Sequence, residues 1–133
     1  MSEANDRPDG DVVEVRIPAD VAYVSTLRLT AAGLAARCEL TIDDIEDLRL
    51  AVDEACALLL PHVAPPNTID ARFELNYGRL AVEVSGQPSG DAELDRKGFA
   101  WTVLGALASS VDVTRADGRL TIALTKRREA ANQ

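Results

Sequence analysis

The sequence contains few aromatic residues, few cysteines and almost no histidine. Its 133 residues include one histidine, two cysteines and 4% aromatic residues, whereas 47% of the residues are hydrophobic. One histidine and two cysteines cannot supply the four Cys and His ligands of a structural zinc site, so we predict no metal site of that kind. The core must instead be built from aliphatic side chains, and a chain of this length favours a single domain.

Long apolar runs and clustered basic residues are also absent. No stretch approaches the roughly 20 apolar residues of a membrane-spanning helix, and the polar segment 1–11 has no apolar signal-peptide region. We therefore expect a cytoplasmic protein without membrane contacts, in which Cys38 and Cys56 are reduced and fill apolar helix faces. The net charge is −8. Nucleic-acid binding requires clustered Lys and Arg, so this charge disfavours direct nucleic-acid contact and favours a basic protein partner.

The most informative stretch, residues 41–63, has the pattern of one long amphipathic helix. Its apolar residues repeat at helical spacing and should cover a sheet: Ile45, Leu48, Val52, Ala55 and Leu59. Thr41 and Asp44 have the spacing of a capping box at the start of the helix. Near the other end, Pro61 is compatible only with a kinked or frayed last turn.

Glu54 projects away from the centre of this apolar stripe. It shares its side of the helix with Asp47, Leu50 and Leu58, because these residues lie at related angles around the axis. Periodicity alone favours the simpler interpretation that Asp47 and Glu54 are ordinary solvent-exposed carboxylates.

The other segments predict strands and two more helices around this one. We expect a strand at 12–18, a helix from 21 to about 36 capped by Asp20, a hairpin of 68–75 and 80–84, a loop at 85–97, a helix at 99–108, and a second hairpin of 111–114 and 119–125. This order predicts an α/β (α+β) two-layer sandwich, with three helices on one face of a mixed, mainly antiparallel sheet. Residues 12–126 would form the single domain, and 1–11 and 127–133 flexible tails.

The element order and three short stretches resemble the GHKL superfamily, also called the HATPase or Bergerat fold. Within it, the chain resembles the anti-sigma factor serine-protein kinases of the RsbW and SpoIIAB type. Residues 47–55, Asp-Leu-Arg-Leu-Ala-Val-Asp-Glu-Ala, are similar to the N-box helix, and residues 98–104 to the second glycine box. Residues 26–30 place Arg28 where members have the first-helix arginine that binds the sigma factor.

This resemblance implies a site for ATP and Mg²⁺. Glu54 matches the general base that activates a serine of an antagonist protein, and His62 follows eight residues later as in many members. The family's magnesium-binding Asn is replaced by Leu58, which offers no oxygen ligand.

The two glycine boxes of the family are also altered. Ser85 and Gly86 occupy the first glycine box, which lacks the Asp that binds the adenine amino group in the family. Gly98 and Ala100 occupy the second glycine box, where Ala100 replaces a family glycine. Phosphoryl transfer depends on positioning and on metal-assisted charge stabilisation, so these changes predict a degenerate nucleotide site.

Three functions follow as alternatives. The first is a homodimeric anti-sigma factor that holds an alternative sigma factor near Arg28 and is released by a STAS-type antagonist. The second is an active ATP-dependent serine kinase, in which Asp47 or Asp53 supplies the missing magnesium contact. The third is a GHKL-like scaffold with a small-molecule or redox-sensing role, tested by whether oxidation joins Cys38 to Cys56.

Three further side chains have simple structural interpretations. Phe99 and Trp101 are expected to pack in the core rather than stack on a ligand. His62 is expected to end a helix with its ring satisfied by solvent or by a carbonyl.

Overall fold

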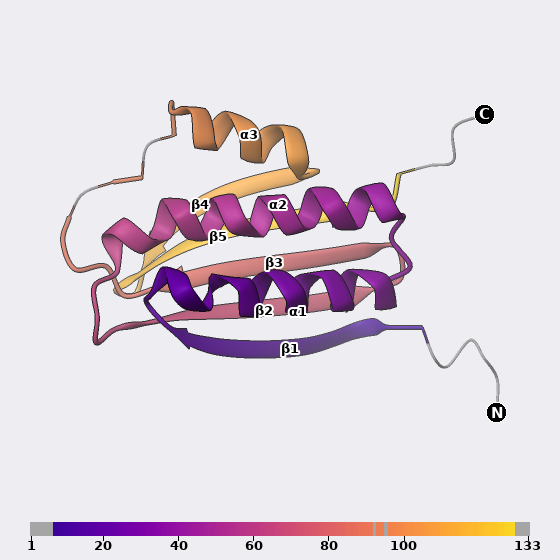
Figure 1. The fold of residues 1–133 in the computed structure, drawn as a ribbon, viewed down its shortest axis with the longest axis horizontal. Helices are drawn as coiled ribbons and strands as arrows, with labels where there is room; N and C mark the ends of the chain where they lie inside the picture. The colour runs from indigo at the N-terminus through magenta and orange to yellow at the C-terminus, as the bar shows by residue number, and fades with distance from the viewer. Residues whose placement is uncertain (1–6, 92, 95, 130–133) are drawn as a thin grey trace.

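The computed structural model describes residues 7–91, 93–94 and 96–129. These residues form two layers, a five-stranded sheet and three α-helices that lie over one of its faces (Figure 1). In chain order the elements are β1 (Asp9–Pro18), the 3-10 turn η2 (Val21–Tyr23), α1 (Val24–Arg37), α2 (Ile42–Leu59), the 3-10 turn η3 (Leu60–His62), β2 (Thr68–Asn76), β3 (Arg79–Gly86), α3 (Phe99–Leu107), β4 (Ser110–Ala116) and β5 (Arg119–Arg127). The predicted two-layer α+β sandwich is confirmed.

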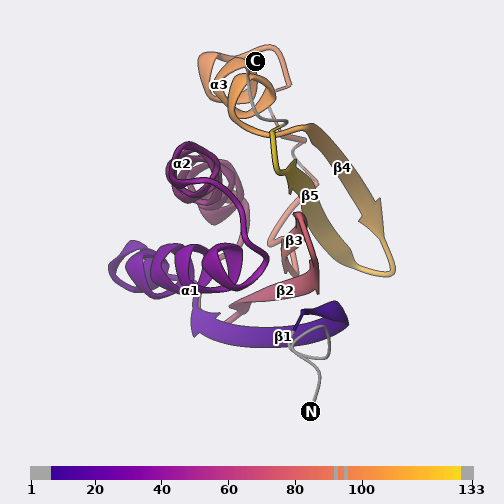
Figure 2. The same ribbon diagram turned by 90° about the vertical axis from the view of Figure 1, so that its right-hand side faces the viewer.

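The sheet has the strand order β1-β2-β3-β5-β4, and each neighbouring pair is antiparallel. The sequence analysis predicted a mixed, mainly antiparallel sheet, whereas the observed sheet contains only antiparallel pairs among the described strands. Along β2, buried and half-buried residues alternate strictly, which directs Ile69, Phe73 and Leu75 toward the helices. Among the described residues, the other face of the sheet carries no helix (Figure 2).

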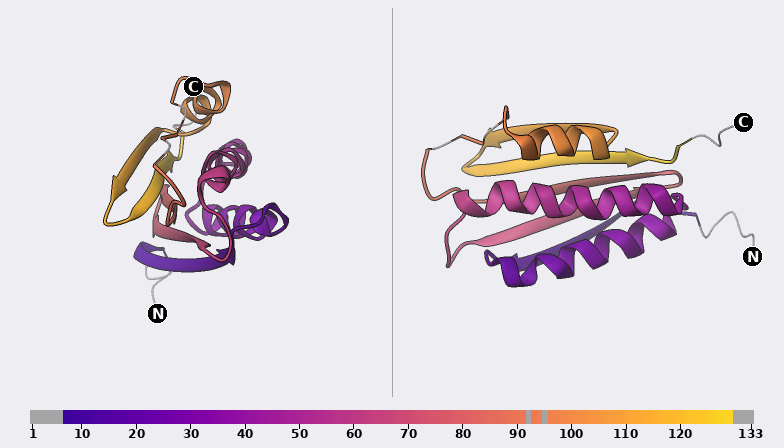
Figure 3. Two further views of the ribbon diagram at one scale, coloured as in Figure 1. Left: turned by 90° about the vertical axis from the view of Figure 1, so that its left-hand side faces the viewer. Right: turned by 45° about the horizontal axis from the view of Figure 1, so that its top comes forward.

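Helix α2 lies between α1 and α3 and packs on the middle of the sheet (Figures 2 and 3). The predicted capping box is present, since Asp44 N donates to Thr41 Oγ1 at 3.1 Å and Thr41 N donates to Asp44 Oδ2 at 3.2 Å. The predicted apolar stripe is also confirmed, because Leu48 and Leu59 both have 0% exposure. Burial of this stripe fixes which flanks of α2 face its two neighbours.

Several boundaries differ from the prediction. Helix α2 ends at Leu59 and continues as η3, which contains Pro61, and the first helix begins with the separate turn η2. Strand β1 begins at Asp9, so residues 9–11 belong to the sheet rather than to a tail. Asp9 and Asp11 are held there by pairing with β2, which overrides their low strand propensity.

The later strands are longer than predicted. Strand β3 extends through Ser85 to Gly86, and β5 extends to Arg127, the first residue assigned to the C-terminal tail. The remainder of the predicted tails includes residues 1–6 and 130–133, which lie outside the described residues.

Hydrogen bonds from backbone N–H groups, to two main-chain oxygens and one carboxylate, join four segments at the end of the molecule where α1 ends. Gly78 N in the β2–β3 turn donates to Cys38 O at 2.8 Å, and Arg128 N donates to Gly78 O at 2.8 Å. Glu129 N donates to Asp44 Oδ2 at 3.2 Å, which connects the chain after β5 to the start of α2. The opposite end contains η2, η3, the loop after β3 and the start of α3 (Figure 1).

Candidate functional site

The two flanks of α2 carry different charged pairs. On the α1 side, Arg28 Nη1 donates to both carboxylate oxygens of Asp53 at 3.0 Å. On the α3 side, the nearly buried Lys126 donates through Nζ to Asp47 Oδ2 at 3.2 Å and to Leu107 O at 2.9 Å. Glu54 lies two turns after Asp47 on the same flank and therefore faces the α3 side.

The Glu54 side chain is half-buried. Within the described ranges, no hydrogen bond or ion pair engages its carboxylate, in contrast to Asp47 and Asp53 on the same helix. An unpaired carboxylate on this flank of α2 can accept a proton from a group that approaches it.

The surroundings of Glu54 do not fit a magnesium ion. Leu58, one turn further along α2, packs against the hydrophobic core and has no oxygen to offer. Asp47 and Asp53, the two candidate replacements, already bind Lys126 and Arg28. In the part of the chain that the structure describes, no group of three or more His, Cys, Asp or Glu side chains could hold a metal ion.

Gly86 ends β3 beneath a buried valine. A Cβ atom added to Gly86 would lie 2.8 Å from Val63 Cγ2 and 3.1 Å from Thr68 O, closer than ordinary van der Waals contact. Val63 has only 1% exposure and therefore little room to move. The space beside this strand end is thus filled by the protein itself, a packing reason for glycine that the sequence did not reveal.

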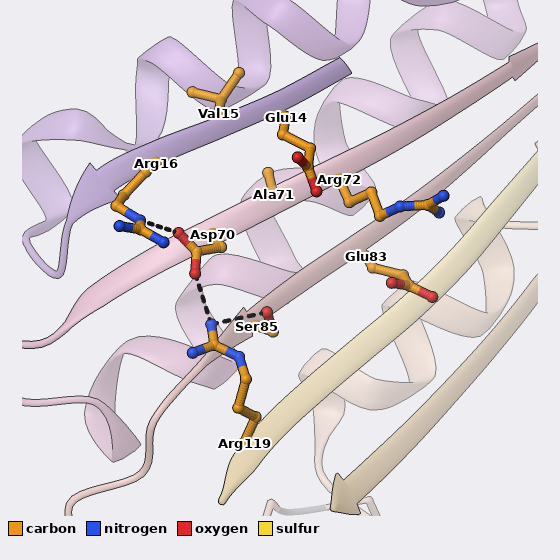
Figure 4. Close-up of a pocket in the computed structure, with 9 residues that line it drawn as sticks. All are labelled: Glu14, Val15, Arg16, Asp70, Ala71, Arg72, Glu83, Ser85 and Arg119. Atoms are coloured by element: carbon orange, nitrogen blue, oxygen red, sulfur yellow. Dashed lines mark hydrogen bonds and ion pairs between the residues drawn. The ribbon is translucent and has the colours of Figure 1, made fainter. Parts of the chain in front are cut away.

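Ser85 points to the opposite face of the sheet and is not brought together with Glu54. Figure 4 shows it in a cavity of about 450 Å³ on the face without helices. Arg119 Nη2 donates to Ser85 Oγ at 3.1 Å and to Asp70 Oδ2 at 2.8 Å, while Arg16 Nε donates to Asp70 Oδ1 at 2.7 Å. The hydrogen bond with Asp70 raises the pKa of Arg16, which remains charged.

This cluster on the open face was missed by the sequence analysis. Arg16 faces Asp70 across the β1–β2 pair, and Asp70 faces Ser85 across the β2–β3 pair. Alternation along each strand places all three on one face, so a register prediction could have identified them.

At the start of α3, the structure separates two aromatic residues that were both predicted to pack in the core. Gly98 is the N-cap without a side-chain hydrogen bond, and Ala100 lies half-buried in the first turn. Trp101 packs against the core as predicted, whereas Phe99 is 83% exposed, so its predicted core packing is wrong. Residues two apart on a helix point about 200° from one another, so the two rings cannot share one face.

The remaining candidates are Cys38, Cys56 and His62. Both thiols are buried and free. Burial raises the pKa of Cys56 to about 12 and raises the pKa of Cys38, which disfavours thiolate chemistry at either residue. His62 fixes the loop after β3 through its backbone, since His62 O accepts from Ser89 N at 2.8 Å and from Ser89 Oγ at 3.0 Å.

Comparisons with known proteins agree with this arrangement. Residues 17–126 match the family model of the histidine kinase-like ATPase domain. The chain therefore belongs to this GHKL-type family, and no helix among its described residues is long and apolar enough to cross a membrane.

Within that class, the chain is similar to proteins named serine-protein kinase RsbW. It is 41% identical over 91 residues to the protein of Bacillus velezensis, covering 65% of this chain and 56% of that protein. It is 37% identical over 93 residues to the protein of Bacillus subtilis, covering 67% and 57%. The matches thus span little more than half of these relatives.

A solved structure shares the fold. The structure of the RsbU and RsbW domains of Rv1364c from Mycobacterium tuberculosis superposes with a TM-score of 0.67 at 20% identity, covering 88% of this chain and 32% of that one.

Proposed function

We propose that this protein is an RsbW-type anti-sigma factor whose nucleotide site no longer transfers phosphate. In this proposal it acts in the cytoplasm as a homodimer, binds an alternative sigma factor through the surface around Arg28, and is released by a STAS-type antagonist. The observation that carries the proposal is that Glu54 is left without a metal environment, because Leu58 packs in the core and Asp47 and Asp53 are paired with basic side chains.

The chemistry of phosphoryl transfer supports this conclusion. Metal ions bridge the phosphates and neutralise charge that develops in the transition state, so a base alone provides little acceleration. Recruiting Asp47 or Asp53 would require breaking the contact with Lys126 or Arg28. Gly86 offers no carboxylate for adenine, and Val63 occupies the space into which a longer side chain would extend.

An active serine-protein kinase is the second candidate. It is favoured by the half-buried Glu54, which has no polar partner within the described residues, and by the name of the RsbW relatives. In this case Glu54 would accept the serine proton of the antagonist, and other groups would have to hold the nucleotide and its metal.

Two measurements on the purified full chain separate these candidates. The first is calorimetric titration with ATP and magnesium, followed in parallel by Trp101 fluorescence, for the wild type and Glu54→Ala. The second is transfer of labelled phosphate to purified STAS-domain proteins of the source organism. We expect no magnesium-dependent binding and no transfer, and transfer that Glu54→Ala abolishes would instead establish the kinase.

Sigma binding is tested separately. Each alternative sigma factor of the source organism is purified and tested against the immobilised chain by biolayer interferometry. Saturable binding of at least one is expected, and binding of none would overturn the anti-sigma proposal.

A further inference from the structure

The cavity of about 450 Å³ on the open face of the sheet has two ends of opposite charge (Figure 4). At one end, Arg16 and Arg119 each donate a hydrogen bond to Asp70, so two cations flank one anion. Arg16 uses only Nε for this contact and Arg119 uses only Nη2. Among the described residues, their other guanidinium nitrogens have no partner. We call this end, formed by Arg16, Asp70 and Arg119, the basic end.

The other end has the reverse arrangement, with two anions beside one cation. Arg72 faces Glu14 across the β1–β2 pair and Glu83 across the β2–β3 pair, and all three side chains line the cavity. Arg72 Nη1 lies 3.5 Å from Glu74 Oε1. Within the described ranges, no hydrogen bond or ion pair engages the carboxylate of Glu14 or of Glu83. We call this end, formed by Glu14, Arg72 and Glu83, the acidic end.

The strand register sets the distance between the basic end and the acidic end. Glu14 and Arg16 are two residues apart in β1, and Asp70 and Arg72 are two residues apart in β2. Each residue of an antiparallel strand advances the chain by about 3.4 Å, so the two ends lie about 7 Å apart. The volume of the cavity also falls within the roughly 300–1,000 Å³ that is typical of small-molecule sites. The cavity therefore suits a small molecule with opposite charges at its two ends.

We propose that this cavity binds a small zwitterion of the ω-amino acid type, in which several methylene groups separate a carboxylate from an ammonium. The carboxylate accepts hydrogen bonds from the unused guanidinium nitrogens of Arg16 and Arg119 at the basic end. The ammonium donates to Glu14 and Glu83 at the acidic end. An amino acid with both charges on one carbon is too short to reach both ends. This inference does not depend on the proposed anti-sigma function.

The charge of the chain makes the basic end distinctive. The chain has a net charge of −8, so a carboxylate that approaches most of its surface is repelled. At the basic end, the attraction of two arginines outweighs the repulsion of Asp70, and no existing ion pair has to break. Arg16 and Arg119 are 72% and 39% exposed, so each contact is weakened by solvent and we expect affinity in the millimolar range.

The test follows the backbone amide resonances of the isotope-labelled full chain by NMR at low ionic strength, where exposed charges interact most strongly. The probe is 4-aminobutyrate. Butyrate and butylammonium each carry one of its two charges, and glycine carries both charges but is too short. We expect saturable shifts confined to residues 14–16, 70–72 and 83–85 with 4-aminobutyrate. Each of the three control compounds should bind about tenfold more weakly, because it loses the contacts of one end.

A pair of variants tests the acidic end. Glu83→Gln removes one of its carboxylates, and Asp112→Asn is the matched control. Asp112 lies in β4 on the same face of the sheet, since the next residue, Val113, is buried toward the helices, but it does not line the cavity. Both variants remove one exposed negative charge, and thermal melting checks that both are folded. We expect Glu83→Gln to bind 4-aminobutyrate about fivefold more weakly than Asp112→Asn.

The outcomes are distinguishable. If butyrate binds as tightly as 4-aminobutyrate, the basic end is an anion site alone and the zwitterion proposal is refuted. Equal affinities of Glu83→Gln and Asp112→Asn would likewise refute it. If 4-aminobutyrate causes no localised shifts while Glu83→Gln changes the oligomeric state in sedimentation velocity, a second copy of the chain covers the open face and the proposal is overturned. None of these results bears on sigma-factor binding, which the interferometry measures separately.

Discussion

Replacing Gly86 by alanine should destabilise the protein through one identifiable contact. The new Cβ would lie 2.8 Å from Val63 Cγ2, and Val63 is itself buried at 1% exposure. The backbone oxygen of Thr68 lies at 3.1 Å on the same side. Overpacking of this kind costs about 1–3 kcal/mol, whereas the restriction of the unfolded chain by alanine contributes only about 0.4–1 kcal/mol in the other direction.

A double-mutant cycle tests this reasoning. Val63→Ala alone should cost about 2 kcal/mol, because it removes two buried methyl groups and leaves a cavity. In the double variant the methyl group introduced by Gly86→Ala enters the vacated space, so the combined loss should be smaller than the sum by about 1–2 kcal/mol. Unfolding in urea, followed by fluorescence of Trp101, the single tryptophan, gives the four free energies.

Gly33→Ala is the matched control for this cycle. Gly33 lies in α1, and a Cβ atom there would meet nothing within 4 Å. The same substitution should therefore stabilise the protein by up to about 1 kcal/mol through helix propensity. Two results would contradict the proposed contact between a Cβ atom at residue 86 and Val63. One is a Gly86→Ala variant that is as stable as Gly33→Ala, and the other is a cost of Gly86→Ala that simply adds to that of Val63→Ala.

Three further predictions concern other contacts. Lys126→Ala should lower the free energy of unfolding by about 1–3 kcal/mol, since it removes a buried aliphatic stem and the hydrogen bond to Leu107 O. Asp47→Asn should cost less than about 1 kcal/mol, because the Asp47 side chain is 41% exposed. If urea unfolding shows the larger loss for Asp47→Asn, Lys126 is not the more important member of the pair. Because the pKa of Cys56 is raised to about 12, the folded state keeps a proton that the unfolded state loses above about pH 9, and the free energy of unfolding should therefore fall between pH 9 and pH 12. In Cys56→Ala this fall should be weaker by about 1.4 kcal/mol per pH unit. Equal slopes in the two proteins would refute burial of Cys56 as the cause. Thr41→Ala should cost about 1 kcal/mol by removing the capping box, measured as a fall of a few degrees in melting temperature, and an unchanged melting temperature would show that the cap contributes nothing.

The fold could be predicted from the sequence because its elements follow local periodicity. The two-residue alternation of β2 and the helical spacing of Leu48 and Leu59 report burial directly, so neither requires knowledge of distant contacts. Element boundaries were less accurate where pairing decides them, as at Asp9, which is in β1 because β2 lies beside it.

The site could be predicted only in part, because its contacts join residues far apart in the chain. Asp53 meets Arg28 across 25 residues, and Lys126 meets Asp47 across 79. Neither pair follows from spacing along one helix. Ser85 is a different case, because the alternation in β3 already placed it on the face opposite the helices, whereas the motif comparison grouped it with the nucleotide residues.

The backbone hydrogen bonds at the end of the molecule where α1 ends have a consequence for how the fold tolerates sequence change. Cys38, Gly78 and Arg128 are joined through main-chain atoms, so replacements of Cys38 or Arg128 other than by proline retain these hydrogen bonds, whereas Gly78, with a φ of 75°, favours glycine. The opposite end depends on particular side chains, such as the valine over Gly86 and the serine that donates to His62 O. Mutations can therefore alter that second end, and any chemistry it performs, while the first continues to hold the sandwich together.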